Sequence, residues 1–215
     1  MTIYNLGSIN ADHVYRVPHL PGAGETLAAH SIQTGLGGKG ANMSVAAARA
    51  GSHVAHIGAV GKDGLWARDR LTEYGVDTRH IAQIDAPTGH AIINVDDAGE
   101  NAITLLSGAN QMIDVNAIDQ ALSAGSHGDI LVMQNETNAQ VEAAKVGSKL
   151  GFRVCYAAAP FEADAVQAVL SHLDFLILNE VEAAQLHDAT GNALVDLPVR
   201  DIIVTLGSKG ARWID

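Results

Sequence analysis

A glycine-rich stretch, residues 35–42 with the sequence GLGGKGAN, is the part of the chain best suited to bind a ligand. Glycines let the backbone adopt positive φ angles and lie close to a ligand, and the alanine-rich run at 43–51 has high helix propensity. A glycine turn that opens a helix presents free N–H groups and the positive end of the helix dipole, which suit anions and hydroxyl-rich ligands. Lys39 adds a cation, and Asn42 adds an amide on the first helical turn.

Three interpretations of this stretch compete: a connection that only caps a helix, a nucleotide-binding loop and a substrate-binding turn. The spacing G-x-G-x-x-G within 35–40 fits a dinucleotide loop, but that loop needs a preceding strand and an acid at the end of the next strand. Residues 31–34 form only a weak strand pattern, and the next strand reaches Val60 without an acid. A Walker loop does not fit either, because glycine follows Lys39 where serine or threonine is needed.

Polar residues follow two other predicted strands. The apolar run 2–7 predicts a first strand, and Asn10 and Asp12 come after it. Residues two apart face the same way on extended backbone, so this amide and carboxylate can clamp sugar hydroxyls; the alternative is Asx-turn chemistry that closes a loop. A buried strand at 129–134 leads to Glu136 in the same manner. Ligands of open α/β sheets collect at the carboxyl ends of strands, which favours a site here.

Two further strand ends have residues suited to phosphate or metal. The strand at 174–178 ends at Asn179, and Glu182 lies three residues on. This pair predicts either an N-cap with a capping-box pattern or contacts to a nucleotide phosphate and, through water, to Mg²⁺, which prefers hard oxygen ligands. The strand at 201–206 is followed by a Gly-x-x-Gly turn at 207–210, whose backbone amides can hold phosphate.

The elements that must position these residues alternate along the chain. Helices are predicted over 41–50, 63–74, 114–124, 138–150, 163–172 and 180–188. Core strands are predicted over 2–7, 53–61, 129–134, 153–157, 174–178 and 201–206, with one more within 76–84 and another beginning at 211. This alternation implies β-α-β units, a parallel sheet and right-handed crossovers. Short strands are expected to form a small separate sheet, at 13–17, 25–33, 89–95 and 101–106.

Composition limits the classes of function. The chain has 215 residues, of which 47% are apolar and 17% charged, as in globular proteins. The net charge of −11 argues against nucleic-acid binding, which needs a basic patch. A single cysteine, Cys155, excludes an internal disulfide and is predicted to be an inert core thiol. The ten histidines are scattered, and His53 and His56 point to opposite faces of a strand, which disfavours a metal role.

Targeting signals are not evident in the sequence. The first nine residues lack the features of a signal peptide, and no apolar run reaches the roughly 18–20 residues of a membrane span. We therefore expect a cytoplasmic protein that binds neither a membrane nor nucleic acid.

A set of residues spread over positions 37–61, in and after the glycine-rich stretch, resembles the first signature of the ribokinase-like sugar kinases, the phosphofructokinase-B family. Six residues carry this match: Gly37, Gly38, Asn42, Ser44, Gly51 and Gly61. The resemblance extends over essentially the whole chain. It implies a three-layer α/β/α fold with a mostly parallel central sheet, formed as a single domain over 1–215. It also implies a small β lid whose strands lie at about 12–34 and 88–106.

The same resemblance implies roles for the strand-end residues. Asn10 and Asp12 would hold sugar hydroxyls, as would Glu136 at the later strand end. The second sugar-binding segment would comprise Gly38, Lys39, Gly40, Ala41 and Asn42. The N-x-x-E motif implies a nucleotide contact at Asn179 and a Mg²⁺ or phosphate role for Glu182. The ATP-binding turn would comprise Thr205, Leu206, Gly207, Ser208, Lys209 and Gly210.

These matches imply ATP-dependent phosphorylation of a small sugar, most simply D-ribose to ribose 5-phosphate, with Mg²⁺ as cofactor and a homodimer formed through the lid. A clamp of Asn10, Asp12 and Glu136 favours a polyhydroxylated sugar over a flat base. The alternatives are a family member that uses a nucleoside or another sugar, a catalytically inactive sugar-binding or dimerising remnant, and, more weakly, a Rossmann dehydrogenase.

The sequence departs from the family pattern in two places. Trp66 stands where the family usually has glycine. The family's second signature, a Gly-Ala-Gly-Asp segment that supplies the anion hole and the aspartate base, is absent, so no catalytic residue is assigned. We expect that segment, and a loop for a monovalent cation such as K⁺, to lie beyond Asp215, and we expect residues 1–215 alone to be inactive.

Overall fold

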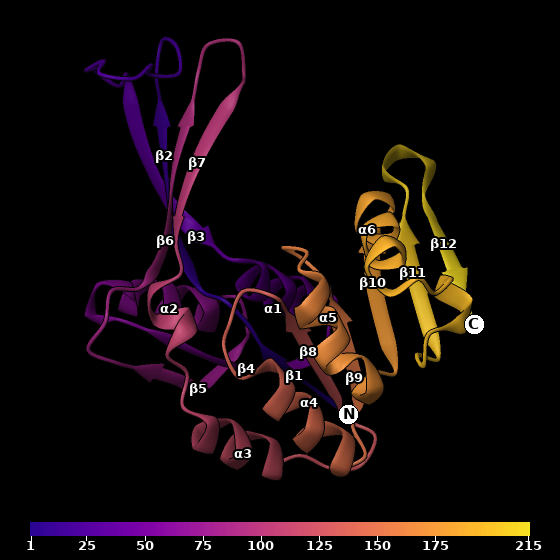
Figure 1. Ribbon diagram of the computed structural model, residues 1–215. Helices are drawn as coiled ribbons and strands as arrows, with labels where there is room; N and C mark the ends of the chain where they lie inside the picture. The colour runs from indigo at the N-terminus through magenta and orange to yellow at the C-terminus, as the bar shows by residue number, and fades with distance from the viewer.

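The computed structural model describes residues 1–215 and contains two β-sheets (Figure 1). The large sheet has eight strands in the order β12-β11-β10-β9-β8-β1-β4-β5. Its neighbouring strands pair in parallel, apart from the antiparallel pair β11–β12. The strands are β1 (Thr2–Leu6), β4 (His53–Val60), β5 (Asp77–Gln83), β8 (Ile130–Gln134), β9 (Arg153–Ala157), β10 (Phe175–Asn179), β11 (Asp201–Thr205) and β12 (Ala211–Ile214).

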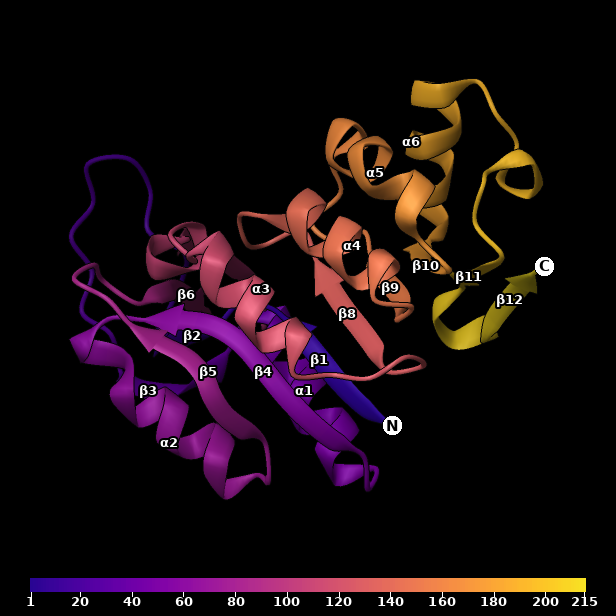
Figure 2. The same cartoon turned by 90° about the horizontal axis from the view of Figure 1, so that it is seen from below.

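Helices lie on both faces of the large sheet (Figure 2). One face, at β1, β4 and β5, is covered by α1 (Lys39–Arg49) and α2 (Leu65–Glu73). The opposite face is covered by α3 (Val115–Ser123), α4 (Gln140–Lys149), α5 (Ala163–Val169) and α6 (Glu180–Thr190). The predicted three-layer fold with a mostly parallel central sheet is therefore confirmed. No helix packs on the α1/α2 side of β9 to β11.

Burial follows from these layers. The strands of a parallel sheet read as nearly continuous apolar runs because both faces are normally covered. Beneath α3 to α6, Leu131 and Leu176 are fully buried, whereas Val132 and Ile177 on the opposite side of the same strands are only half-buried. A core cluster of 27 buried residues lies on the first side, and a second cluster of eight lies mostly beneath α1 and α2.

The small sheet has the strand order β3-β2-β6-β7 and projects from the carboxyl edge of the large sheet (Figure 1). Its strands are β2 (Asn10–Arg16), β3 (Ser31–Gly37), β6 (Gly89–Val95) and β7 (Asn101–Leu106). Its register places Asp12, Ala91 and Leu105 in one row. The next row on the same face contains Val14, Ile93 and Ile103.

Several predicted strands differ in extent from the observed ones, and the strand expected at 13–17 is β2, which already begins at Asn10. The strand expected at 25–33 is β3, at Ser31–Gly37. The sequence predicts a turn at the glycines that end this strand, yet the backbone up to Gly37 pairs with β2 in full register. The strand expected from 129 begins at Ile130, and the Asp129 carboxylate just before it accepts bonds from the N–H groups of Thr2 and Ser126.

Cys155 is half-buried on the side of the sheet that faces no helix, and is less enclosed than predicted. Burial nevertheless raises the pKa of its thiol to about 11. A thiol with such a pKa is almost wholly protonated at neutral pH, so the prediction that it is unreactive still holds.

Buried polar side chains join the large sheet to α1. The Asn5 amide donates to Ser44 Oγ over 2.8 Å and to the Gly40 carbonyl over 2.7 Å. His56 Nδ1 lies 2.8 Å from Ser44 Oγ, and Nε2 lies 3.0 Å from the Gly7 carbonyl oxygen. A carbonyl only accepts, so Nε2 carries the proton and Nδ1 accepts from the serine hydroxyl. The neutral imidazole therefore fixes β4 to the residue after β1.

The burial of His56 makes the stability of the fold dependent on pH below neutrality. Burial lowers the pKa of His56 from 6.5 to about 4, although the bond to Gly7 opposes the shift. The unfolded chain takes up the proton near pH 6.5 and the folded protein does not. The contribution to the free energy of unfolding is therefore complete above pH 6.5 and falls by about 3 kcal/mol as the pH drops to 4.

His56→Gln should remove this slope, so that the stability gap between the native protein and the variant narrows from pH 7 to pH 5 in urea unfolding experiments. His53→Gln, at an exposed position on the same strand, serves as the control and should keep the slope. Parallel stability curves for the native protein and His56→Gln would show that this histidine does not resist protonation.

Candidate active site

The candidate site lies where the order of the strands reverses. From β1 the chain builds β4 and β5 on one side and β8 to β12 on the other, and Leu6 pairs with Met133 at the carboxyl ends of β1 and β8. Ligands of open α/β sheets bind at such a switch point. Ser8 follows β1 and Glu136 follows β8, so the fold brings these two loops together.

The Glu136 carboxylate occupies the start of α1. Its Oε1 accepts from Lys39 Nζ over 2.8 Å, and its Oε2 accepts from the Lys39 backbone N–H over 3.0 Å and from the Ser8 hydroxyl. The Glu136 side chain is 10% exposed, against 43% for Lys39. A carboxylate at a helix N-terminus is stabilised by the dipole. The anion that the glycine-rich turn binds in this structure is therefore a residue of the protein itself.

Close backbone approach explains the glycines before α1. Gly38 has φ of 91°, and a side chain there would meet the Ser8 carbonyl 2.8 Å away. A side chain on Gly40 would collide with the backbone of Gly7 and Ser8. The Ala41 N–H donates to the Ser8 carbonyl over 2.8 Å. The stretch thus packs bare backbone against the loop after β1.

Asn10 is buried and held by a residue that sequence reasoning did not assign to the site. Its Oδ1 accepts from Asn110 Nδ2 over 2.8 Å, while Asn110 Oδ1 accepts from the Ile9 N–H over 2.9 Å. Asn110 is 2% exposed. Asparagine is common in turns, so nothing in the sequence distinguishes Asn110 from a loop residue; Ser8 was missed for the same reason.

Asp12 lies on the face of the small sheet that carries Leu105, and its carboxylate forms no hydrogen bond or ion pair within the protein. Gly35 lies opposite Asp12 on β3, and a side chain on the diagonal neighbour Gly37 would run into the Asp12 carboxylate. Burial, with a smaller contribution from the charge of Glu136, raises the pKa of Asp12. Its two oxygens are therefore partly desolvated and remain available to hydroxyl donors.

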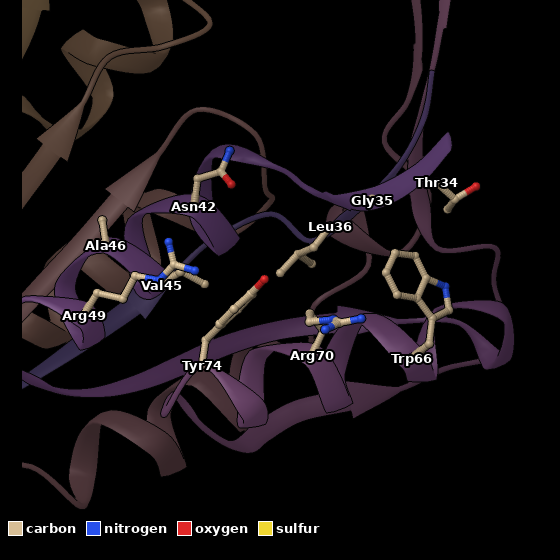
Figure 3. Close-up of a pocket in the computed structure, with 10 residues that line it drawn as sticks. All are labelled: Thr34, Gly35, Leu36, Asn42, Val45, Ala46, Arg49, Trp66, Arg70 and Tyr74. Carbon is tan, nitrogen blue, oxygen red and sulfur yellow. The ribbon is translucent and has the colours of Figure 1, made fainter. Parts of the chain in front are cut away.

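A cavity of about 180 Å³ lies between these loops and the small sheet. Ser8, Asn10 and Glu136 contribute polar groups to it, and Leu105 of β7 lines it from the small sheet. Asn42 is not in this cavity; it lines a larger one between α1, α2 and β3 (Figure 3). Of the eight predicted sugar-binding residues, the structure places Asn10 and Glu136 in this cavity and holds Lys39 against Glu136, whereas Asp12 and Asn42 do not line it.

The predicted nucleotide-binding residues lie at the same edge of the sheet, beyond β9. Asn179 and Thr205 are paired at the carboxyl ends of β10 and β11. Asn179 Oδ1 accepts from the Glu182 N–H, and Glu182 Oε2 accepts from the Asn179 N–H, each over 2.8 Å. The capping-box interpretation is confirmed. It uses one carboxylate oxygen of Glu182 and leaves the other for a further partner.

The turn after β11 is a short 3₁₀ turn at Gly207–Lys209. Gly207 and Gly210 have φ of 59° and 92°, values that favour glycine. The turn closes through bonds from the N–H groups of Leu206, Lys209 and Gly210. The N–H groups of Gly207 and Ser208 have no backbone acceptor, so they are free to bind an anion.

No group of three or more His, Cys, Asp or Glu side chains is arranged to bind a metal ion. None of the helices combines the length and the apolar character that crossing a bilayer requires.

Comparison with known sequences agrees with this geometry. The family model described as pfkB family carbohydrate kinase matches residues 2–215. A ribokinase of Haemophilus influenzae is 38% identical over 224 residues, which cover 97% of this chain and 73% of that protein. A deoxyribokinase of Salmonella typhi is 32% identical over 230 residues, which cover 100% of this chain and 75% of that protein.

Solved structures show the same fold. Ribokinase from Thermotoga maritima superposes with a TM-score of 0.86 at 27% identity, covering 100% of this chain and 75% of that one. Ribokinase from Arabidopsis thaliana, complexed with ribose and ATP, superposes with a TM-score of 0.81 at 26% identity, covering 99% of this chain and 74% of that one. Since the family model spans nearly the whole sequence, this chain belongs to the pfkB family of carbohydrate kinases.

Proposed function

We propose that the protein phosphorylates a small sugar with ATP as donor, and that the sugar is D-ribose. The observation that carries this proposal is the polar cavity at the junction of β1 and β8, where Asn10 and Glu136 converge near the unpaired carboxylate of Asp12. The relatives named ribokinase support ribose as the sugar. We also propose that residues 1–215 form a single domain, into which the strands of the small sheet are inserted.

The geometry suits a polyhydroxylated ligand. Carboxylate oxygens accept bonds from hydroxyl groups, and the Lys39 ammonium and Asn10 amide donate to them. The cavity of about 180 Å³ is smaller than pockets for drug-sized ligands. We propose that the small sheet acts as a lid, because Leu105 lies at the cavity and an apolar row of Val14, Ile93 and Ile103 lies beside it. A lid of this kind excludes water from the reacting groups.

The second half of the proposal concerns the nucleotide. ATP phosphates would accept bonds from the free N–H groups at 207–208 and lie beside Asn179. The second carboxylate oxygen of Glu182 fits Mg²⁺, an ion that keeps several waters and needs only one or two carboxylates besides phosphate oxygens. When bound, Mg²⁺ neutralises charge on the phosphates. Phosphoryl transfer depends chiefly on such positioning and charge stabilisation, and no residue of this chain is assigned as the base or as a K⁺ ligand.

Ribose binding tests the sugar site directly. Asp12→Asn removes the charge but keeps the shape of the side chain that packs against Gly37. It should weaken ribose binding by roughly 10-fold or more, as loss of a charged hydrogen bond does. Isothermal titration calorimetry measures this without requiring turnover. Asp97→Asn, at the exposed tip of the β6–β7 hairpin, is the control and should bind as the native protein does. Equal ribose affinity in Asp12→Asn would refute the clamp, and tighter binding of 2-deoxyribose or a nucleoside would reassign the substrate.

The nucleotide site is tested at Glu182. Glutamine also completes a capping box, so Glu182→Gln keeps the start of α6 intact and removes only the charge. The expected result is that Mg²⁺ no longer strengthens ATP binding in this variant, measured by calorimetry with and without the ion. The matched control is Glu180→Gln, in the same helical turn, which should retain the Mg²⁺ effect. If both variants respond to Mg²⁺ as the native protein does, Glu182 has no metal role.

We also infer that two copies of the chain associate through the lid. Ile103 and Leu105 are 59% and 49% exposed and lie on one face of β7, the edge strand. Exposed apolar rows and open sheet edges are typical of interaction surfaces. A second lid packed on this face would also cover Val14 and Ile93.

This dimer is testable with two adjacent substitutions. Ile103→Glu puts a charge on the apolar face and should convert the protein from dimer to monomer in size-exclusion chromatography with light scattering. Thr104→Glu puts the same charge on the opposite face and should leave the dimer intact. A native protein that elutes as a monomer, or a dimer that survives Ile103→Glu, would contradict the inference.

A further inference from the structure

The larger cavity between α1, α2 and β3 has a volume of about 520 Å³ and shares no lining residue with the 180 Å³ cavity (Figure 3). Its volume lies within the range of small-molecule sites. The residues that line it from α1 and α2 recur at helical intervals, so they lie on one side of each helix. Asn42 and Arg49 lie two turns apart on α1, while Trp66, Arg70 and Tyr74 follow one another at four-residue intervals along α2 and its C-terminal end.

The charge of this cavity is opposite to that of the protein. Two guanidinium groups, of Arg49 and Arg70, line it, and no carboxylate does, although the chain carries a net charge of −11. Arg49 forms no ion pair and lies 4.7 Å above the centre of the Tyr74 ring. Arg70 pairs with Glu73 at 3.0 Å, but both side chains are more than half exposed, so this pair is weak. Most of the N–H donors of both guanidinium groups are therefore free to bind an anion.

Flat aromatic surfaces accompany these donors. Trp66 and Tyr74 are 37% and 36% exposed, and Figure 3 shows Arg70 between their rings along α2. Exposed rings beside guanidinium groups offer both stacking and charge recognition. We propose that this cavity binds a small aromatic phosphate, with the phosphate on Arg49 and Arg70 and the ring of the ligand stacked on Trp66.

The experiment uses phenyl phosphate as the probe and Trp66 as the reporter. The chain has two tryptophans, so Trp213→Phe leaves Trp66 as the only one. Phenyl phosphate should quench its fluorescence saturably. Inorganic phosphate and phenol should bind more weakly, because the first lacks the aromatic ring and the second lacks the phosphate group. Calorimetry on the native protein gives the same affinities independently of the Trp213 substitution.

Charge variants then locate the site. Arg49→Gln and Arg70→Gln, in the Trp213→Phe background, should each weaken phenyl phosphate binding roughly tenfold, which corresponds to about 1.4 kcal/mol. Arg68→Gln changes the charge equally on the same helix but lies outside the cavity, and should leave binding unchanged.

Three results would overturn the proposal. The first is the absence of saturable binding, which would mean that Arg49 and Arg70 only hold α1 against α2. The second is an equal effect of Arg68→Gln and the two cavity variants. The third is displacement of the probe by saturating ATP or ribose, which would place it in the kinase site.

Discussion

The Glu136 carboxylate at the start of α1 is the contact on which the site depends. It joins the end of β8 to Lys39 and, through Ser8, to the end of β1. A carboxylate that is 10% exposed must be paired, because desolvating an unpaired charge is costly. The surrounding donors satisfy both of its oxygens. Such a pair adds little net stability but fixes geometry, and here it holds the loops that follow β1 and β8 against the start of α1.

A second set of buried polar groups, joined by hydrogen bonds, lies deeper in the fold. Gln134 donates to Asn5, Asn5 donates to Ser44, and Ser44 bonds to His56. Two of these side chains also bond to backbone carbonyls, at Gly40 and Gly7. Hydrogen bonds in the low-dielectric interior rigidify the groups that they join, and in this chain of bonds only Gln134 Oε1 has no partner. The main chain that forms the candidate site is therefore positioned from inside the fold.

The sequence was sufficient for the parallel sheet, the alternating helices and the residues at the strand ends, because apolar runs and their polar termini are local patterns. It was insufficient where the role or conformation of a residue depends on partners that are distant in the chain. Asn110 acts through Asn10, one hundred residues earlier, and β3 is a strand because β2 pairs with it despite its glycines. Asn42 shares a helix with Lys39, but the direction of its side chain depends on how α1 packs against α2.

The short links between the two sheets have a mechanical consequence. β2 begins four residues after β1 ends, and β3 ends two residues before α1 begins. Ser8 and Gly38, which lie within these links, are also hydrogen-bonded or packed at the site. The small sheet is therefore joined to the large sheet and to α1 at residues that belong to the candidate site. A molecule bound at its far end therefore acts on a sheet that is separated from Ser8 and Gly38 only by these short links.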